Sequence, residues 1–486
     1  MKIYKNYIGG KWVSSSSKKT FFSENPATLQ KLGKFQLSNK KDVDKAVESA
    51  RKAFKKWKEV PAPKRGDILF KVAGLLKRDK ERLAKLVTVE MGKVINEARG
   101  DVQEAIDMFE YIAGEGRRLF GHTTPSELKN KFAMTIRVPI GVCALITPWN
   151  FPVAIPAWKI APALICGNTV VFKPSSDTPL CAVELVKVLI EAGVPKGVVN
   201  LVTGSAEDVG QTLVKHKDVD MISFTGSVFT GEYITKNAGL KKVGLELGGK
   251  NPIIVMEDAD INLAVDGIIW GAFGTTGQRC TAASRVVVHR KIKKRLENAL
   301  LKRTKRLRLG NGLNKKTDIG PLINKKALEK SARYVSIGKK EGAKLLCGGK
   351  IAKLKGYYFK PTIFAEVKKN MRIAQEEIFG PIVAIISVNN LDEAINVANS
   401  VRYGLSSSIY TNNISYAFKS IQDIEAGLTY INSSTIGSEV HLPFGGMKDT
   451  GNGTREGGIH GVEEFSEVKT VYVDYSDRLQ KAQGVE

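Results

Sequence analysis

Cysteine and histidine are scarce in this sequence, which has 5 of each among 486 residues. The cysteines are odd in number and no two of them form a CxxC pair, so neither a disulfide framework nor a thiolate metal site is indicated. We therefore predict no bound metal ion and a reducing compartment. The amino terminus, MKIYKNYIGGKWV, lacks the apolar run of a signal peptide, which favours a cytoplasmic protein.

Membrane-spanning runs are missing as well. Residues 138–158 carry no charge and are long enough to imitate a span, but they include four prolines and Asn150. Proline removes a backbone donor and interrupts the hydrogen-bonded helix that a bilayer requires. We expect no membrane partner.

Negative charge is in deficit, because 75 lysines and arginines face 49 acids and leave a net charge of +26. Such an excess raises the question of nucleic acid. The positive residues, however, occur as Lys-Lys pairs among apolar helix positions near residues 40–56, which is typical of a solvated helix face. No zinc-finger, helix-turn-helix or RNA-binding motif is present. We predict no nucleic-acid partner, although a binding protein on an enzyme scaffold remains an alternative that a salt-dependent DNA shift assay would test.

The pattern that is present is that of a large α/β protein. Apolar residues recur every three or four positions from 40 to about 118, which predicts a helical layer. After Gly141, β-branched runs alternate with helical stretches, and a second such series follows Gly249. This alternation predicts two doubly wound lobes with parallel sheets. The segments 120–137 and 461–486 belong to neither series.

Three groups in this frame could carry chemistry. Cys280 lies in a loop between an apolar helix and a strand, and Arg279 beside it is expected to favour the thiolate. Glu246 lies in LELGGKNP, where burial would raise its pKa towards that of a general base. The turn from Phe224 to Ser227 follows a strand and opens a helix, as a phosphate cradle does. A small buried thiol and an ion-paired hinge acid are the competing interpretations. The glycine-rich GNGTREGG at 451–458 follows no strand, so we interpret it as an ordinary loop.

Seven motifs, in order along the chain, resemble the aldehyde dehydrogenase superfamily. They are ITPWNFP at 146–152, VFKP at 171–174, FTGS at 224–227, LELGGK at 245–250, GQRC at 277–280, EEIFGP at 376–381 and PFGG at 443–446. The resemblance implies an α/β fold with a Rossmann-like cofactor lobe and a catalytic lobe. It also implies NAD(P)-dependent, hydrolytic oxidation of an aldehyde.

By this resemblance, Cys280 is the nucleophile, Asn150 with the Cys280 N–H is the oxyanion hole, and Glu246 activates water. The implied cofactor-binding residues are Ile146, Thr147, Trp149, Lys173, Ser175, Ser176, Gly226, Ser227, Leu247, Glu377 and Phe379. The expected substrate-binding residues are Phe151, Ile155, Trp158, Arg279, Arg99 and Ser434.

The same matching divides the chain. Residues 1–118 and 141–248 are expected to form the cofactor-binding domain, and 249–441 the catalytic domain. Residues 119–140 and 461–486 resemble the family's oligomerisation arms, whose strands add to the sheet of a neighbouring subunit. We expect a homo-oligomer, either a dimer or a tetramer.

Two single residues refine the expected activity. Ser176 stands where many NAD-preferring relatives have a glutamate that repels a 2′-phosphate, so we predict that NADP is used at least as well as NAD. Arg279 resembles the arginine of relatives that oxidise acidic aldehydes, which favours 2-oxoglutarate semialdehyde, succinate semialdehyde or glyceraldehyde 3-phosphate. A coenzyme A-acylating enzyme is the alternative, but such relatives generally lack the glutamate found here as Glu246.

Overall fold

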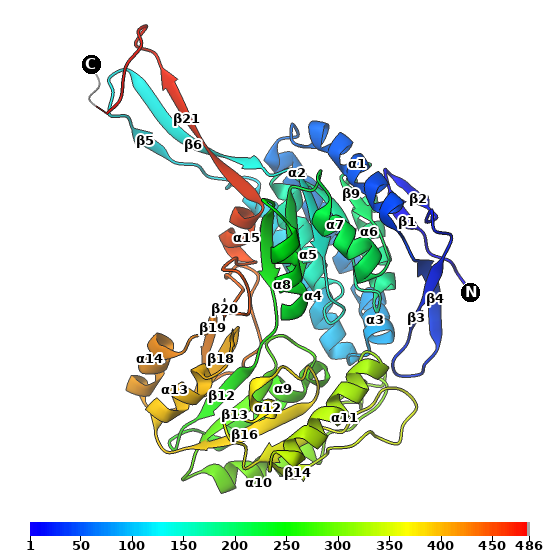
Figure 1. Cartoon of the computed structure of the whole chain (residues 1–486), viewed down its shortest axis with the longest axis vertical. Helices are drawn as coiled ribbons and strands as arrows, with labels where there is room; N and C mark the ends of the chain where they lie inside the picture. Colours follow the sequence, from blue (N-terminus) through cyan, green and yellow to red (C-terminus); the bar gives the residue numbers. More distant parts are fainter. Residues whose placement is uncertain (484–486) are drawn as a thin grey trace.

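The computed structural model describes residues 1–483 as two α/β units and a projecting β arm (Figure 1). The last three residues of the predicted carboxyl-terminal arm, 484–486, lie outside the described residues. No helix among residues 1–483 is long and apolar enough to cross a membrane. Residues 138–158 instead form the end of one strand, a second strand and the start of a helix.

The first unit is built on a seven-stranded sheet of order β11-β10-β7-β8-β9-β1-β2. Its five strands from β11 to β9 are parallel, and β1 and β2 add antiparallel at the edge. The strands are β1 (Asn6–Ile8), β2 (Lys11–Val13), β7 (Val142–Ile146), β8 (Thr169–Lys173), β9 (Val199–Leu201), β10 (Met221–Thr225) and β11 (Lys242–Glu246). A separate hairpin joins β3 (Thr20–Glu24) and β4 (Lys31–Gln36).

Helices cover both faces of this sheet, as the alternation of strands and helices predicts. They are α1 (Lys40–Trp57), α2 (Ala62–Arg78), α3 (Lys80–Met91), α4 (Ile95–Glu115), α5 (Ala154–Ile165), α6 (Pro179–Glu191), the short π-helix η1 (Ala206–Gly210), α7 (Gln211–Lys215) and α8 (Val228–Asn237). In β7, Cys143 packs into the core on one face and Val142 into the core on the other. Because successive strand residues point to opposite faces, a continuous apolar run buries both sides of the sheet.

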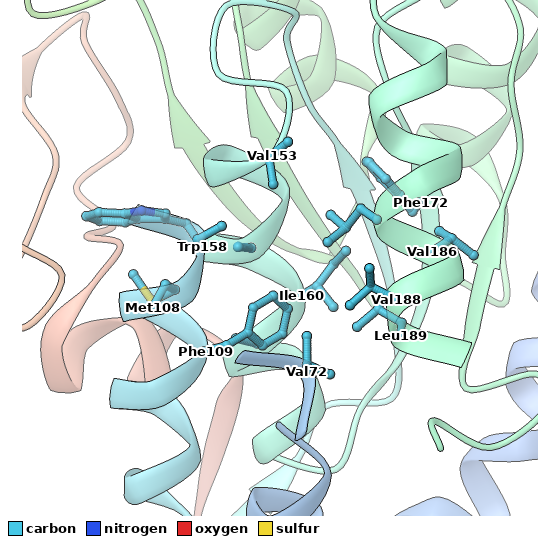
Figure 2. Packing of buried hydrophobic residues seen from close by; sticks show 14 of the residues in the cluster. Val72, Met108, Phe109, Val153, Trp158, Ile160, Phe172, Val186, Val188 and Leu189 are labelled. Atoms are coloured by element: carbon cyan, nitrogen blue, oxygen red, sulfur yellow. The ribbon is translucent and has the colours of Figure 1, made fainter. Parts of the chain in front are cut away.

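A buried hydrophobic core packs against α4, α5 and α6, and part of it is drawn in Figure 2. Phe109, Ile160 and Val188 are fully or almost fully buried there. Trp158 lies at the margin of this cluster, and its indole points away from Ile160 in the figure. The packing therefore fixes α5 firmly while leaving one of its aromatic side chains at the edge of the core.

The second unit has a seven-stranded sheet of order β14-β15-β16-β13-β12-β18-β19, parallel except for β14. Its strands are β12 (Asn251–Val255), β13 (Ala283–His289), β14 (Lys344–Cys347), β15 (Thr362–Ala365), β16 (Ile382–Val388), β18 (Ser406–Tyr410) and β19 (Leu428–Ile431). Its helices are α9 (Ile261–Phe273), the 3₁₀ turn η2 (Gly274–Gly277), α10 (Lys293–Thr304), α11 (Lys325–Lys340), α12 (Arg372–Gln375), α13 (Leu391–Asn399) and α14 (Ile414–Asp423). Beside it, β17 (Tyr403–Gly404) pairs with β20 (Met447–Lys448).

The arm is a three-stranded antiparallel sheet that projects from the first unit (Figure 1). It consists of β5 (Thr123–Pro125), β6 (Lys131–Pro139) and β21 (Ser466–Asp474). The segment 461–486, which belongs to neither α/β series, thus contains a strand. The residues just before it form α15 (Gly458–Glu464), which packs against α5. The start of the predicted tail is therefore part of the first unit, because α15 buries Val462 in its core.

Candidate active site

Two cavities meet at Cys280, between the carboxyl ends of the two sheets. One, of about 250 Å³, runs over the ends of β7 and β10 and across to Lys330 and Glu377. The other, of about 130 Å³, lies towards α4 and α5 and includes Glu246. Ligand sites in open α/β folds occur at this edge of the sheet, because the loops after the strands gather there. We call them the cofactor-side cavity and the substrate-side cavity.

The loop that carries Cys280 is strained and firmly held. Thr275 and Thr276 in η2 have left-handed φ values of 50° and 59°. Gln278 fastens the loop, because its side chain donates to the Thr275 carbonyl at 3.1 Å and accepts from the Ile323 N–H at 2.9 Å. Residues held in sparsely populated conformations occur where a function requires a fixed geometry. The sulfur is thereby held at the mouth shared by the two cavities.

Residues 247–250, which link β11 to β12, and the adjoining Asn251 pack against this loop. Asn251 Nδ2 donates to the Cys280 carbonyl at 2.7 Å. A Cβ at Gly249 would lie 2.4 Å from that carbonyl oxygen, and one at Gly248 would lie 2.7 Å from Glu377 Oε2. Only glycine allows the link to approach both groups so closely. The LELGGK motif therefore places Glu246 and supports Cys280 at the same time.

Asn150, in the loop after β7, reaches the same point from the first unit. Its Nδ2 donates to the Gln278 carbonyl at 3.1 Å, while Oδ1 is buried without a hydrogen-bond partner. An amide nitrogen has two hydrogens, so one remains free to face the cavity. The structure thus brings Asn150 to Cys280, as the sequence predicts.

The thiol of Cys280 is not activated by its neighbour in sequence. Burial, together with the carboxyls of Glu246 and Glu377, raises the pKa of Cys280 to about 12. Arg279 Nε donates to Thr275 Oγ1 at 2.9 Å and its Nη2 lies 3.6 Å from Glu97. The expectation of a stabilised thiolate is wrong, because burial and the two carboxyls dominate the environment of the thiol.

Glu246, at the end of β11, is buried and its Oε1 has no hydrogen-bond partner. Burial raises its pKa well above the ordinary value, and the nearby carboxyl of Glu456 raises it further. Lys159 opposes this shift; its Nζ pairs with Glu456 and lies 2.9 Å from Ser223 Oγ. The predicted direction of the shift and its main cause are confirmed.

The predicted cofactor residues near the cysteine line the cofactor-side cavity. Those that line it are Trp149, Gly226, Ser227, Leu247, Glu377 and Phe379. Ser227 caps α8, so the first N–H groups of that helix open towards the cavity and suit a phosphate. Phe379 has a left-handed φ of 60° and meets Trp149 edge to face at 5.5 Å. Glu377 accepts from the Gly249 N–H at 3.0 Å. A helix N-terminus, an acidic acceptor and apolar walls together fit a nicotinamide dinucleotide.

The remaining predicted cofactor residues lie further along the sheet edge, outside this cavity. Ile146 pairs with Lys173 across β7 and β8, and Thr147 follows with an unpartnered buried hydroxyl. Lys173 is buried, which lowers its pKa to about 8.

Two serines follow Lys173. Ser175 Oγ lies 3.5 Å from a carboxylate oxygen of Asp177, and Ser176 Oγ donates to the Gly204 carbonyl at 3.0 Å. The exposed carboxylate of Glu207 raises the pKa of Lys173 against the effect of burial. It therefore supplies a negative charge near Lys173 although Ser176 has none.

Four of the predicted substrate residues line the substrate-side cavity, namely Phe151, Ile155, Trp158 and Arg279. The Arg279 guanidinium lies over the rings of Trp270 at 4.8 Å and Phe151 at 5.3 Å. Trp158 meets Phe444 edge to face at 5.6 Å. The cavity thus combines aromatic walls with one cationic side chain.

Arg99 and Ser434 are not brought to either cavity, which corrects the expectation for both. Arg99 pairs with Glu81 at 2.8 Å on an exposed part of α4. Ser434 donates to the Gly267 carbonyl at 2.9 Å and is buried. The positions of Arg99 and Ser434 depend on how distant segments pack, and no local motif indicates that packing.

Several lining residues were missed by the sequence reasoning. Glu456 lines the substrate-side cavity from the GNGTREGG segment, which is a loop, as predicted, but also reaches the site. Glu104 comes from the helical layer and Ser438 from the segment before the PFGG motif. Lys330 lines the cofactor side from α11. None of these four residues lies within one of the seven motifs, so no local pattern in the sequence marked them.

Comparison with known proteins agrees with this geometry. Residues 12–471 match the family model described as "Aldehyde dehydrogenase family". An alpha-ketoglutaric semialdehyde dehydrogenase of Bacillus subtilis is 44% identical over 97% of this chain and 98% of its own length. A 2,5-dioxopentanoate dehydrogenase of Saccharolobus solfataricus is 40% identical over 97% of this chain and 99% of its own.

Other relatives of similar identity have different names. Retinaldehyde dehydrogenase 3 of Mus musculus is 42% identical over 98% of this chain and 94% of its own. Among solved structures, betaine aldehyde dehydrogenase of Staphylococcus aureus in complex with NAD⁺ superposes with a TM-score of 0.96. It is 36% identical over 99% of this chain and 97% of its own.

Proposed function

The chain belongs to the aldehyde dehydrogenase family, and on that premise we propose that it oxidises a short anionic semialdehyde to the acid with NAD(P) as hydride acceptor. The substrate class is that of 2-oxoglutarate semialdehyde, with succinate semialdehyde and glyceraldehyde 3-phosphate as alternatives of like charge. The observation that carries this proposal is that Arg279 and Cys280 line one small cavity. Relatives named for the semialdehyde of 2-oxoglutarate support it.

The size of this cavity favours one of the substrate types for which the relatives are named. Its volume of about 130 Å³ lies below the roughly 300 to 1,000 Å³ typical of pockets for drug-sized ligands. A long apolar aldehyde would fill such a space poorly and would leave Arg279 without an anionic partner. A short semialdehyde fits the small volume, and its one carboxylate supplies the negative charge.

Cys280 is the proposed nucleophile. Its sulfur, as thiolate, adds to the carbonyl carbon, and the oxyanion of the resulting thiohemiacetal accepts hydrogen bonds from Asn150 Nδ2 and the Cys280 N–H. An oxidised nicotinamide, when bound, would supply the hydride acceptor. Loss of the hydride restores the carbonyl and leaves a thioester on Cys280.

Glu246 is the proposed base for the second half of the reaction. Its carboxylate removes a proton from water, the water oxygen attacks the thioester carbon, and the C–S bond breaks with its electron pair returning to sulfur. Coenzyme A-acylating relatives generally lack this glutamate, so its presence favours transfer of the acyl group to water over transfer to coenzyme A. Its burial within the substrate-side cavity supports hydrolysis.

The cofactor assignment rests on the groups along the carboxyl edge of the first sheet. We propose that Lys173, Ser175 and Ser176 hold the adenosine ribose, with Ile146 and Thr147 beneath it. The α8 N-terminus and Ser227 would hold the pyrophosphate, and Glu377 with Phe379 the nicotinamide riboside. NADP should be used at least as well as NAD, because Ser176 places no carboxylate against a 2′-phosphate.

We further propose a homo-oligomer in the cytoplasm. The arm strand β21 exposes Val468, Tyr472 and Val473 and has an unpaired edge within the described residues. An exposed apolar edge strand is a template for another chain. Sedimentation of the full chain as a monomer at micromolar concentration would contradict the oligomer.

We also propose a division into two domains. Residues 1–118 and 141–248 would form the cofactor-binding domain, and residues 249–441 the catalytic domain.

The decisive experiment measures kcat/KM with NAD and with NADP for succinate semialdehyde, 2-oxoglutarate semialdehyde, butanal and retinal. We expect the two acidic aldehydes to be preferred over butanal by about tenfold or more. A preference for butanal or retinal over both acids would overturn the substrate class. DNA binding without aldehyde oxidation would overturn the enzyme assignment altogether.

A further inference from the structure

One face of α4 carries three carboxyl groups, and one of them, Glu104, lines the substrate-side cavity. Glu97, Asp101 and Glu104 are spaced by three or four residues, which places them on one side of the helix. The first two have defined partners, whereas Glu104 forms no ion pair with any residue from 1 to 483. This difference singles out Glu104 within the cavity wall.

The partners of the first two carboxyls are cations. Asp101 pairs with buried Lys93 at 3.0 Å and also accepts from the Ala154 N–H at 2.8 Å. Glu97 accepts from the Thr275 N–H at 2.8 Å and lies 3.6 Å from Arg279. The charges of Asp101 and Glu97 are thus offset by those of Lys93 and Arg279. Glu104 is the third carboxyl on this face of the helix.

Glu104 lines the cavity itself, together with Arg279 and Trp158. The indole N–H of Trp158 faces the Glu104 carboxyl and favours its charged form. Burial outweighs this effect: with Asp101 also raising the pKa of Glu104, and Lys93, Arg279 and Trp158 lowering it, that pKa is raised to about 7. A neutral carboxylic acid is therefore available near neutral pH.

A second anion changes the balance. If an anionic substrate entered while Glu104 was ionised, two uncompensated negative charges would share one desolvated pocket, which is strongly unfavourable. A protonated carboxyl group removes one of these charges and becomes a donor. Hydrogen bonds from O–H to a carboxylate are among the strong ones in proteins.

We propose that Glu104 is a specificity-determining residue that, as a neutral acid, donates a hydrogen bond to the distal carboxylate of the substrate while Arg279 holds it from the other side. The inference rests on the proposed function, because it requires an anionic semialdehyde. No covalent step is added to the reaction. Glu104 acts on which aldehyde is held and leaves the chemistry at Cys280 unchanged.

The signature of this role is a ratio of rates. The other ionisable groups that line the cavity, besides Arg279, are Glu246, Glu456 and Cys280. The ratio of kcat/KM for succinate semialdehyde to that for butanal cancels their effect on the chemical steps, and Glu104→Gln separates their charge from that of Glu104. This ratio should fall by up to about tenfold per pH unit above the pKa of Glu104, because the donor is lost and a repelling charge appears.

The experiment measures this ratio from about pH 5.5 to about pH 9 for the wild-type chain, Glu104→Gln and Asp107→Asn. The amide of Glu104→Gln keeps a donor but cannot ionise, so its ratio should stay constant at the low-pH value of the wild type. Asp107→Asn removes a carboxyl that bonds to Gln103 on the same helix, and its ratio should follow the wild type.

Two outcomes would overturn the role of Glu104 while leaving the proposed function intact. They are a wild-type preference for succinate semialdehyde that does not change with pH, and a pH-dependent ratio that persists in Glu104→Gln. A preference of the wild type for 4-aminobutanal that grows with pH and disappears in Glu104→Gln would mean that the carboxylate binds cations. The proposed function itself fails if the ratio stays near or below one at every pH in both proteins.

Discussion

The two cavities that meet at Cys280 are built from different parts of the chain. The cofactor-side cavity is formed by loops after strands, by the N-terminus of α8 and by glycines that allow close approach. The substrate-side cavity takes ionisable side chains from α4, from the loop of Cys280 and from the segment after β20. On the proposed function, the first cavity would bind the cofactor used with every aldehyde, whereas the second, which also contains Glu246, would decide which aldehyde is held.

The largest effect is expected at the point shared by both cavities. Cys280→Ala should lower aldehyde oxidation by at least about a thousandfold, because no other group supplies the nucleophile. Cofactor binding should persist, since its cradle does not use the thiol. Steady-state rates and cofactor titration measure the two effects. Cys347→Ala, which changes a thiol outside both cavities, should keep full activity; loss of activity there would contradict the assignment.

The next effect distinguishes the two half-reactions. Glu246→Gln should slow deacylation by about a hundredfold or more, because an amide cannot accept a proton from water. Intact-mass analysis after rapid quench should then detect an acyl adduct on Cys280. Unchanged turnover with no adduct would exclude this role.

The pH dependence of deacylation follows from the environment of Glu246. Since burial raises its pKa well above the ordinary value, the proton is retained to higher pH and the active carboxylate is scarce in acidic solution. Deacylation in the wild type should therefore rise as pH increases through this raised pKa, above the usual range of a glutamate. The same profile in Glu246→Gln should lose that rise; a rise that persists would assign it to another group.

The substrate side is tested by Arg279→Leu. A charge-assisted hydrogen bond contributes roughly 1.5 to 3 kcal/mol, so kcat/KM for succinate semialdehyde should fall by about ten- to a hundredfold. Butanal is the control, because the loss of a partner for Glu97 would affect both aldehydes equally. Equal losses would show that Arg279 supports the loop and does not bind substrate.

The smallest effect concerns the far end of the cofactor. Ser176→Glu should shift the ratio of kcat/KM from NADP towards NAD by roughly tenfold, because a carboxylate would face the 2′-phosphate. Glu207→Gln should shift it the opposite way, since Glu207 already places a negative charge near Lys173. A wild type that strongly prefers NAD, with no response to Glu207→Gln, would refute the importance of Ser176.

The order of strands and helices was readable from local patterns. The apolar helix expected before the Cys280 loop is α9, and the FTGS turn does open a helix, with Ser227 as its cap. Hydrophobic periodicity and capping residues act within a few positions, so they are present in the sequence itself. The motifs also placed Asn150, Glu246 and Cys280 correctly around one point.

What the sequence by itself determined is therefore the α/β framework and the generic chemistry that its motifs hold. Only the tertiary structure decided that Arg279 pairs with Glu97, that Arg99 pairs with Glu81, and that Glu104 lines the cavity. The physical reason is that charge pairing and pKa depend on which groups share a buried space. That space is enclosed by α4, the Cys280 loop and the tail, which lie far apart along the chain and meet only when it folds.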